Sequence, residues 1–391
     1  MYIPVKIVWK PPSTSRNKFF LVVSFITIII LLHFPFFAQI YESRQREAIA
    51  NMGIALIDNS NLTYSYLVTQ DELNFPLAYS ILVHNYPKRV IRLLKAIYRP
   101  HNHYCIHVDK RSSANYYDEI LSNSAQLGGN IIIVPKDQRI QVNWGTMSVL
   151  EPEMLCAKLL LQKDKKWMYW INLTGHEFPL RTNRELVAAL KALNGSNIVQ
   201  AINKGKNNLR FPRSSYLPFN LTWYKGGVHV ALRREFVDYM LNDPKAIQLY
   251  EALKLYEITE SRMGFPDEAF FPTLNHNPSV FPVPGAFLGK HDEDVATLLT
   301  RAKIWWYHGL PCSTNHWRRG ICIFGVGDLP FLFKNPHFFA NKFLPTVEPL
   351  AYDLLELWFA DKVHYELAFG TMHPSFNLTF YQKHEFSWNH L

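Results

Sequence analysis

An alternation of short apolar runs with segments of helical periodicity, over residues 78–193, constrains the fold of this chain more than any other feature. Residues 78–83 predict a buried strand, apolar spacing over 90–98 predicts a helix that ends before Pro100, and residues 104–108 predict a second strand. A strand, a helix and a strand in this order form a crossover, which pairs the two strands in parallel. We therefore predict an α/β fold with a mostly parallel central sheet flanked by helices.

The alternation continues along the chain. Residues 131–134 and 167–173 predict further strands. Between them, residues 147–161 predict a helix that is interrupted near Pro152, because proline lacks the backbone N–H that a helix interior needs. A capping box, with Thr at the cap and Glu three residues later, opens a predicted helix over 182–193.

Open parallel sheets bind ligands beyond the carboxyl ends of their strands. This rule nominates His84, Asp109 and the turn at 174–177, with Glu177 as its acidic residue, as substrate-binding positions. The sequence contains neither Gly-x-Gly-x-x-Gly nor a phosphate-loop motif. A dinucleotide-binding or P-loop enzyme is therefore disfavoured.

A charge-free apolar stretch at residues 19–38 is long enough to cross a bilayer as a helix. More basic residues precede it than closely follow it, so the positive-inside rule predicts a cytosolic tail over 1–18. A cleaved signal peptide is the competing interpretation, but the stretch is long for one and Phe36 is large where cleavage requires a small residue. We predict a signal-anchor at 19–38, a stem over 39–75 and one globular domain over 76–391.

Composition limits the class of partner. A chain of 391 residues with 48% hydrophobic residues can bury a substantial core. The formal net charge is +9, but Lys and Arg are scattered, with no basic block and no zinc-finger spacing, which disfavours nucleic acid. A basic groove for an anionic small substrate explains the excess equally well.

The side of the membrane that would hold the domain is oxidising, which makes the four cysteines candidates for disulfides. Four cysteines allow three pairings, and spacing alone does not choose among them. Asn172 matches the glycosylation tripeptide but ends an apolar run, which favours a structural role. The other Asn-x-Ser/Thr acceptors fit a secretory route; they are Asn61, Asn194, Asn220 and Asn377.

Two adjacent carboxylates stand between a proline and an aromatic run at residues 264–271. Pro266 favours the first turn of a helix, which would place Asp267 and Glu268 at a helix N-terminus. An ionised carboxylate in a half-apolar setting suits a general base. Acidic residues that merely cap a helix are the alternative interpretation.

Seven segments resemble the core-2/I-branching β-1,6-N-acetylglucosaminyltransferases, in order and with similar gaps, over roughly residues 76–345. They include Ile171-Asn172-Leu173-Thr174-Gly175-His176-Glu177-Phe178-Pro179 and Cys322-Ile323-Phe324-Gly325-Val326-Gly327-Asp328-Leu329. The others are 78–84, 96–100, 104–110, 266–268 and 339–343.

This resemblance implies a Golgi type II membrane enzyme with a GT-A-like fold. The implied reaction is inverting transfer of GlcNAc from UDP-GlcNAc to a hydroxyl, expected to be a 6-OH, which forms a β-1,6 branch on O-glycans without a divalent metal or other cofactor. Glu268 matches the catalytic base, Arg319 and Lys342 match the basic pair that holds the diphosphate, and Asp109 matches a position near the uridine. The resemblance also implies the disulfides Cys105 with Cys156 and Cys312 with Cys322.

Some positions depart from the family pattern. No counterpart is found near 200–201 for an acidic residue that core-2 enzymes use on the acceptor, and the segment 309–312 is shortened. Trp306, within 303–307, offers an aromatic platform for a sugar face, with a core helix ending in aromatics as the alternative. A peptide O-xylosyltransferase using UDP-xylose and a catalytically inactive glycan-binding homologue are the competing functions.

One acidic triplet bears on metal use. Residues 292–294 match the Asp-x-Asp pattern of metal-dependent sugar-nucleotide enzymes. The triplet follows the expected base instead of preceding it, and it stands before a helical pattern, where acids cap a first turn. We therefore expect no metal site, because Arg319 and Lys342 can neutralise the diphosphate.

Overall fold

The computed structural model describes residues 68–202, 210–212, 216–261, 263–289 and 299–391. The chain divides into two units, and the one described here spans Tyr66–Leu391. The predicted signal-anchor at 19–38 and most of the predicted stem lie outside the described residues. Among the helices of the described residues, none is long and apolar enough to cross a membrane.

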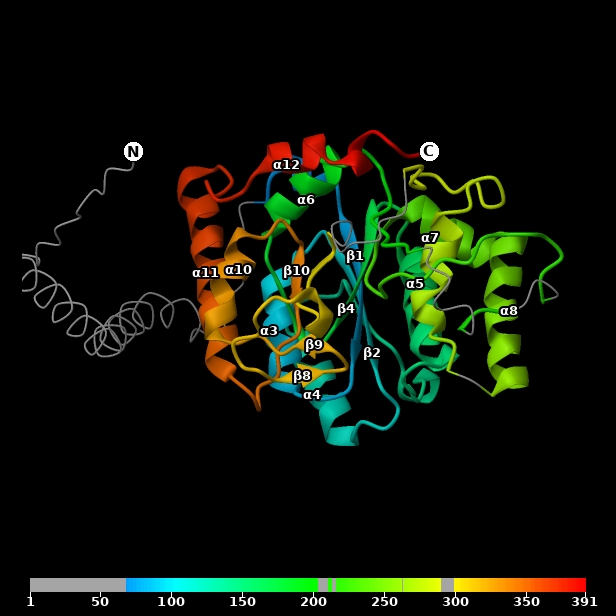
Figure 1. Ribbon diagram of the computed structural model, residues 1–391. Helices are drawn as coiled ribbons and strands as arrows, with labels where there is room; N and C mark the ends of the chain where they lie inside the picture. The colour runs from blue at the N-terminus through cyan, green and yellow to red at the C-terminus, as the bar shows by residue number, and fades with distance from the viewer. Residues whose placement is uncertain (1–67, 203–209, 213–215, 262, 290–298) are drawn as a thin grey trace, which may run out of the picture. The chain divides into compact units, whose positions relative to one another are not determined.

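A five-stranded sheet forms the centre of the unit (Figure 1). Four strands run parallel and the last is antiparallel to its neighbour, which confirms the predicted α/β class and the mostly parallel sheet. The buried strands are apolar on both faces, as parallel strands covered by helices require. In spatial order they are β3 (Ile131–Ile133), β2 (His103–Val108), β1 (Leu77–Val83), β4 (Tyr169–Thr174) and β6 (Ala231–Arg233).

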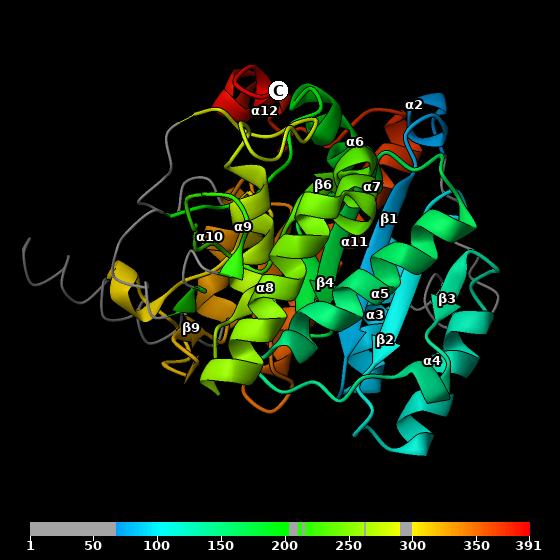
Figure 2. The ribbon, with the colours of Figure 1, turned by 90° about the vertical axis from the view of Figure 1, so that its right-hand side faces the viewer.

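Helices cover both faces of this sheet. Alternate side chains of β1 point to opposite sides, so Tyr79 and Ile81 enter one core and Ala78 the other. One core is completed by α3 (Pro87–Ile97), α4 (Ala114–Ala125), α6 (Asn183–Ala192) and α12 (Leu378–Lys383). The other core is completed by α5 (Met147–Lys163), α7 (Arg234–Asn242), α8 (Pro244–Glu260) and α9 (Phe270–Asn275), of which α5, α7 and α8 lie together in Figure 2.

A smaller sheet continues directly from β4. It consists of β5 (Glu177–Pro179), β10 (Phe339–Asn341) and β7 (Arg301–Ala302), and it packs with α10 (Leu329–Lys334) and α11 (Pro349–Phe369). A separate hairpin is formed by β8 (Trp317–Arg318) and β9 (Ile321–Cys322). Short 3₁₀ turns occur at η1 (Lys136–Gln138), η4 (Pro266–Glu268), η6 (Trp306–His308), η7 (Val326–Asp328) and η8 (Glu385–Ser387).

Helix α5 corrects the expectation of an interruption at Pro152. The helix runs through the proline without a break. Proline removes one backbone donor, whereas Leu150, Cys156 and Leu160 are fully buried against the sheet and neighbouring helices. Burial of that face therefore outweighs the single lost hydrogen bond.

The folded unit begins before the predicted boundary at residue 76. Helix α2 (Gln70–Leu73) is held to α6 by Asp71, whose carboxylate lies 2.8 Å from Lys191 Nζ, and by Glu72, which accepts a hydrogen bond from Asn183. The capping box that opens α6 is present as predicted, because Thr182 and its partner three residues later exchange both hydrogen bonds.

Candidate active site

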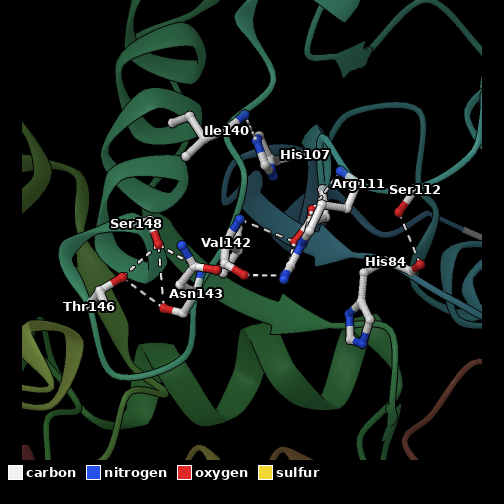
Figure 3. A network of polar contacts seen from close by, with 10 residues as sticks. His84, His107, Arg111, Ser112, Ile140, Val142, Asn143, Thr146 and Ser148 are labelled. Atoms are coloured by element: carbon white, nitrogen blue, oxygen red, sulfur yellow. Dashed lines mark hydrogen bonds and ion pairs between the residues drawn. The ribbon is translucent and has the colours of Figure 1, made fainter. Parts of the chain in front are cut away.

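The carboxyl ends of β1, β2 and β4 meet at one edge of the central sheet, because the three strands are parallel neighbours. His84 and Asp109 follow the first two strands, and the Asp109 amide donates to Val83 O at 2.9 Å. Ser112 Oγ donates to the His84 carbonyl at 3.0 Å (Figure 3). The predicted strand-end residues therefore lie together, and their substrate contacts remain a prediction.

Asp109 anchors the loop at 139–146 to the end of β2. Its Oδ2 accepts from Arg111 Nη2 at 3.0 Å and from the Val142 amide at 3.2 Å, and Arg111 also donates to the Val142 carbonyl (Figure 3). Burial alone would raise the pKa of Asp109, but hydrogen bonds from Arg111 and Val142 bring this pKa below its usual value. Asp109 is thus an ionised support for that loop.

Two neutral imidazoles stand at the same edge. The rings of His84 and His176 meet edge to face with centroids 5.4 Å apart. Burial lowers the pKa of His84 and brings the pKa of His176 to about 3, with the neighbouring His84 adding to the second effect. Neither ring adds positive charge near neutral pH, so the charge of the site comes from Lys and Arg.

Glu268 lies on the 3₁₀ turn η4, and the helix α9 begins only at Phe270, which corrects the expected α-helical N-terminus. Phe265, just before Pro266, has φ of 50°, a left-handed conformation that is rare for a bulky residue. The Glu268 side chain is 27% exposed, and its Oε2 lies 3.0 Å from Arg210 Nη1 and 3.4 Å from Lys225 Nζ. The carboxylate therefore reaches the surface in a fixed orientation.

The neighbouring carboxyl of Asp267 has a different environment. Asp267 is buried, and its Oδ1 has no hydrogen-bond partner among the described residues. Burial, followed by repulsion from Glu268, raises the pKa of Asp267 to about 7. Of the two adjacent carboxyl groups, only that of Glu268 reaches the surface.

Arg319 occupies the tip of the β8–β9 hairpin. It forms a two-residue turn with Gly320, and the two residues have φ of 55° and 76°, as a type I′ turn requires. Glycine adopts a positive φ without strain, and it also avoids a clash here, because a Cβ at position 320 would lie 2.8 Å from the Trp306 ring. A left-handed arginine is unfavourable, so the turn holds strain at a predicted functional residue.

Two disulfides have the pairing that the resemblance implied. Cys312 is bonded to Cys322 in β9, so the bond closes the loop that carries Arg319. Cys105 in β2 is bonded to Cys156 in α5. Asp328 further fixes the hairpin region, because its carboxylate accepts from the Ser313 hydroxyl and amide.

Lys342 lies near Arg319, and Lys303 lies near Lys342. Lys342 follows β10, and burial together with the nearby Arg319 lowers the pKa of Lys342 to about 8. Lys303 is buried next to β7, and its burial lowers its pKa to about 7 even though Glu177 opposes this shift. The predicted basic pair therefore shares one site, where an anion would relieve the mutual repulsion of the cations.

Glu177 departs from the prediction of a substrate contact. Its side chain is fully buried, with Oε2 2.8 Å from Arg301 Nε and Oε1 accepting from Asn341 and Thr174. A carboxylate enclosed in this way cannot touch a substrate. Glu177 instead joins the central sheet to the small sheet beneath Lys342.

Trp306 lies beside the β8–β9 hairpin that carries Arg319, called the arginine hairpin below. Its backbone amide donates to Gly320 O at 3.0 Å, and its side chain is 68% exposed, with Tyr307 62% exposed next to it. The alternative of a core helix ending in aromatics is wrong, since β7 is followed by the 3₁₀ turn η6. An aromatic platform for a sugar remains a prediction.

Sequence reasoning missed three residues of this site. Arg210 and Lys225 contact the predicted base from loops far away in the chain, and Trp144 lies under Arg319. None of the three belongs to a motif with a recognisable spacing. The conspicuous Gly264-Phe265-Pro266 sequence was the one local signal of the strained turn.

Three of the predicted glycosylation asparagines lie at the surface. Asn194, Asn220 and Asn377 are exposed, and Asn61 lies outside the described residues. Asn172 is buried and donates a hydrogen bond to Val228 O, in keeping with a structural role.

The described residues contain one group of three possible metal ligands, which consists of Asp328 and the two cysteines of a disulfide. The acidic triplet at 292–294 lies outside the described residues.

Comparison with known proteins identifies the family. The model of the core-2/I-branching enzyme family matches residues 77–330. This chain belongs to the core-2/I-branching enzyme family. Apart from Lys342, the residues of the described site lie within this range. The resemblance seen in the sequence is confirmed.

Relatives of known activity match most of the chain. A zebrafish (Danio rerio) β-1,3-galactosyl-O-glycosyl-glycoprotein β-1,6-N-acetylglucosaminyltransferase 4 is 32% identical over 74% of this chain and 71% of its own length. The human enzyme numbered 3 is 30% identical over 78% and 72%. A mouse N-acetyllactosaminide β-1,6-N-acetylglucosaminyl-transferase is 33% identical over 76% of each chain.

Proposed function

We propose that this family member transfers GlcNAc from UDP-GlcNAc to a hydroxyl of a glycan acceptor and forms a β-1,6 branch on O-glycans. The observation that carries this proposal is the placement of Glu268 and of the Arg319 and Lys342 pair in one site. Arg210 pairs with Glu268 and stacks on Phe265. The Phe265 ring meets the Trp144 ring, on which Arg319 stacks. Burial, followed by the nearby Arg319, lowers the pKa of Lys342. The names of the relatives support the donor sugar and the linkage.

The geometry suits direct displacement with inversion in a GT-A-type site. Glu268 accepts the proton of the acceptor hydroxyl while that oxygen forms a bond to the anomeric carbon. The bond from the anomeric carbon to the diphosphate oxygen breaks, and UDP leaves with the electron pair. Arg319 and Lys342 stabilise the charge that develops on the diphosphate.

A donor and acceptor panel tests the proposal. Purified protein would be incubated with UDP-GlcNAc, UDP-GalNAc, UDP-galactose and UDP-xylose, each with a core-1 O-glycan or an N-acetyllactosamine acceptor, and UDP release would be measured. We expect turnover with UDP-GlcNAc and a β-1,6 linkage in the product by NMR. Preference for UDP-xylose would identify a xylosyltransferase, and glycan binding without UDP release would identify an inactive homologue.

We also propose that transfer needs no divalent metal. Arg319 and Lys342 supply fixed positive charge where a metal-dependent enzyme would place Mg²⁺ or Mn²⁺. Activity with UDP-GlcNAc should therefore be unchanged in excess EDTA. Loss of activity in EDTA that Mn²⁺ restores would show that a metal takes part, and Asp292→Ala would then test the acidic triplet.

The site is proposed to face the Golgi lumen, with residues 19–38 as a signal-anchor. Two disulfides and three glycosylation tripeptides whose asparagines are exposed suit a lumenal domain. Protease protection of intact Golgi vesicles tests this topology. We expect the domain to be digested only after detergent is added.

A further inference from the structure

Trp144 lies between the predicted diphosphate cation and the turn that carries the predicted base. The guanidinium carbon of Arg319 is 4.2 Å from the centre of the Trp144 ring. The same indole meets Phe265 edge to face, with ring centroids 4.8 Å apart at 76°. Trp144 is 48% exposed, so its packing on these two residues is not explained by the need to fill a core.

The stack continues from Phe265 to the base. The guanidinium carbon of Arg210 is 4.1 Å from the Phe265 ring, and Arg210 Nη1 lies 3.0 Å from Glu268 Oε2. Cations and aromatic rings thus run without a break from Arg319 to Glu268. Each cation faces the electron-rich side of a ring, which is an attractive arrangement.

The backbone on either side of Trp144 is held by hydrogen bonds. On one side, the Val142 amide and carbonyl are held by Asp109 and Arg111 (Figure 3). On the other side, Gly145, with φ of 82°, accepts a hydrogen bond from the Phe265 amide at 3.0 Å. The indole is therefore a supported platform and not a free surface side chain.

We propose that Trp144 is a positioning residue that holds the Arg319 guanidinium in place for the diphosphate of the donor; this inference depends on the proposed UDP-sugar donor. Arg319 lies at the tip of a two-residue turn, where a long side chain would otherwise sample many rotamers. Stacking on Trp144 removes part of that freedom before UDP arrives, which lowers the entropy lost on binding. Trp144 acts through Arg319 and makes no contact with substrate in this scheme.

Calorimetric titration with UDP and with uridine tests the role. A cation stacked on an indole contributes about 0.5 to 2 kcal/mol, so Trp144→Ala should weaken UDP binding about 3- to 30-fold. Uridine binding should be unchanged, because uridine has no diphosphate. Trp144→Phe should retain UDP affinity within about threefold, whereas Trp144→Leu should bind UDP as weakly as the alanine variant. Trp388→Ala, which removes a tryptophan that is 68% exposed outside the site, is the matched control.

A double-mutant cycle separates positioning from a general structural effect. In an Arg319→Ala background, Trp144→Ala should cost no further UDP affinity. The positioning role of Trp144 would be overturned if Trp144→Ala weakened UDP binding equally in the wild-type and Arg319→Ala backgrounds. It would also be overturned if Trp144→Ala weakened uridine and UDP binding equally. If the alanine variant fails to fold, the contrast between the Phe and Leu variants decides the question. Wild-type protein that binds no UDP would refute the donor assignment and this role together, whereas normal UDP binding by both Trp144→Ala and Trp144→Leu would refute this role alone.

Discussion

Arg210 Nη1 lies 3.0 Å from Oε2 of Glu268. Lys225 Nζ lies 3.4 Å from the same oxygen. The other carboxylate oxygen of Glu268, Oε1, forms no ion pair or hydrogen bond within the described residues. Two cations on one oxygen fix the plane of the carboxylate and leave the other oxygen for an incoming hydroxyl. The arrangement therefore orients the proposed base before an acceptor binds.

Replacing the base should separate catalysis from donor binding. Glu268→Gln keeps the shape of the side chain but cannot accept the acceptor proton, so turnover should fall by about 10² to 10³ while UDP affinity stays nearly unchanged. Asp267→Asn is the matched control. Because Asp267 is buried, this substitution should reduce turnover far less than Glu268→Gln does. Rates of UDP release with saturating donor and acceptor check both variants. Near wild-type turnover in Glu268→Gln would show that another group is the base.

Replacing Arg319 should weaken UDP binding without lowering the stability of the fold. Its φ of 55° is easier for asparagine, so Arg319→Asn should leave the melting temperature unchanged or raise it slightly. The same change removes charge-assisted hydrogen bonds to phosphate, which are worth about 1.5 to 3 kcal/mol, so UDP affinity should fall at least tenfold. Asn315→Gly, in the same loop and also at positive φ, should leave UDP affinity unchanged. A fall in stability without loss of UDP affinity would contradict this assignment.

The disulfide at the arginine hairpin should affect donor binding more than the disulfide of the core. Replacing Cys312 and Cys322 by Ser opens a loop with a sequence separation of 10, at a cost of about 2 to 4 kcal/mol, and loosens the turn that presents Arg319. Replacing Cys105 and Cys156 by Ser should lower the melting temperature but leave the UDP affinity of the folded protein near that of wild type. Melting curves and UDP titrations of both double variants make the comparison. Equal UDP affinities in the two would show that the hairpin keeps its shape without its bond.

The sequence predicted those parts of the fold that local pattern decides. The runs at β1 and β2 are recognisable because buried parallel strands are apolar on both faces, and the α6 cap is recognisable because its box is local. Pro152 was misinterpreted because proline is a local signal, whereas the burial that overrides it comes from distant elements. Glu177 was misplaced for a related reason. A strand-end acid can face a ligand or a buried partner, and Arg301 lies far away along the chain.

The candidate site shows the same division. Glu268, Arg319 and Lys342 belong to motifs that the family resemblance identifies, so they could be named before the fold was known. Arg210 and Trp144 act through contacts between loops, and no spacing in the sequence predicts that a guanidinium will reach a ring or a carboxylate from another segment. Such positions depend on the whole fold.

The pH dependence of UDP binding should follow Lys342. Burial and the nearby Arg319 lower the pKa of its ammonium to about 8, so the free protein loses this positive charge as pH rises through that value. A bound diphosphate favours the protonated lysine, so binding above this pH requires proton uptake, and affinity should fall by up to about tenfold per pH unit. Lys342→Arg keeps its charge throughout and should flatten the profile measured by titration calorimetry from about pH 7.5 to 9.5. Lys303, with a pKa of about 7 in the free protein, would add to the slope in this window only if bound UDP raised its pKa as well. An unchanged slope in Lys342→Arg would therefore assign the titration to another group and remove Lys342 from the diphosphate site.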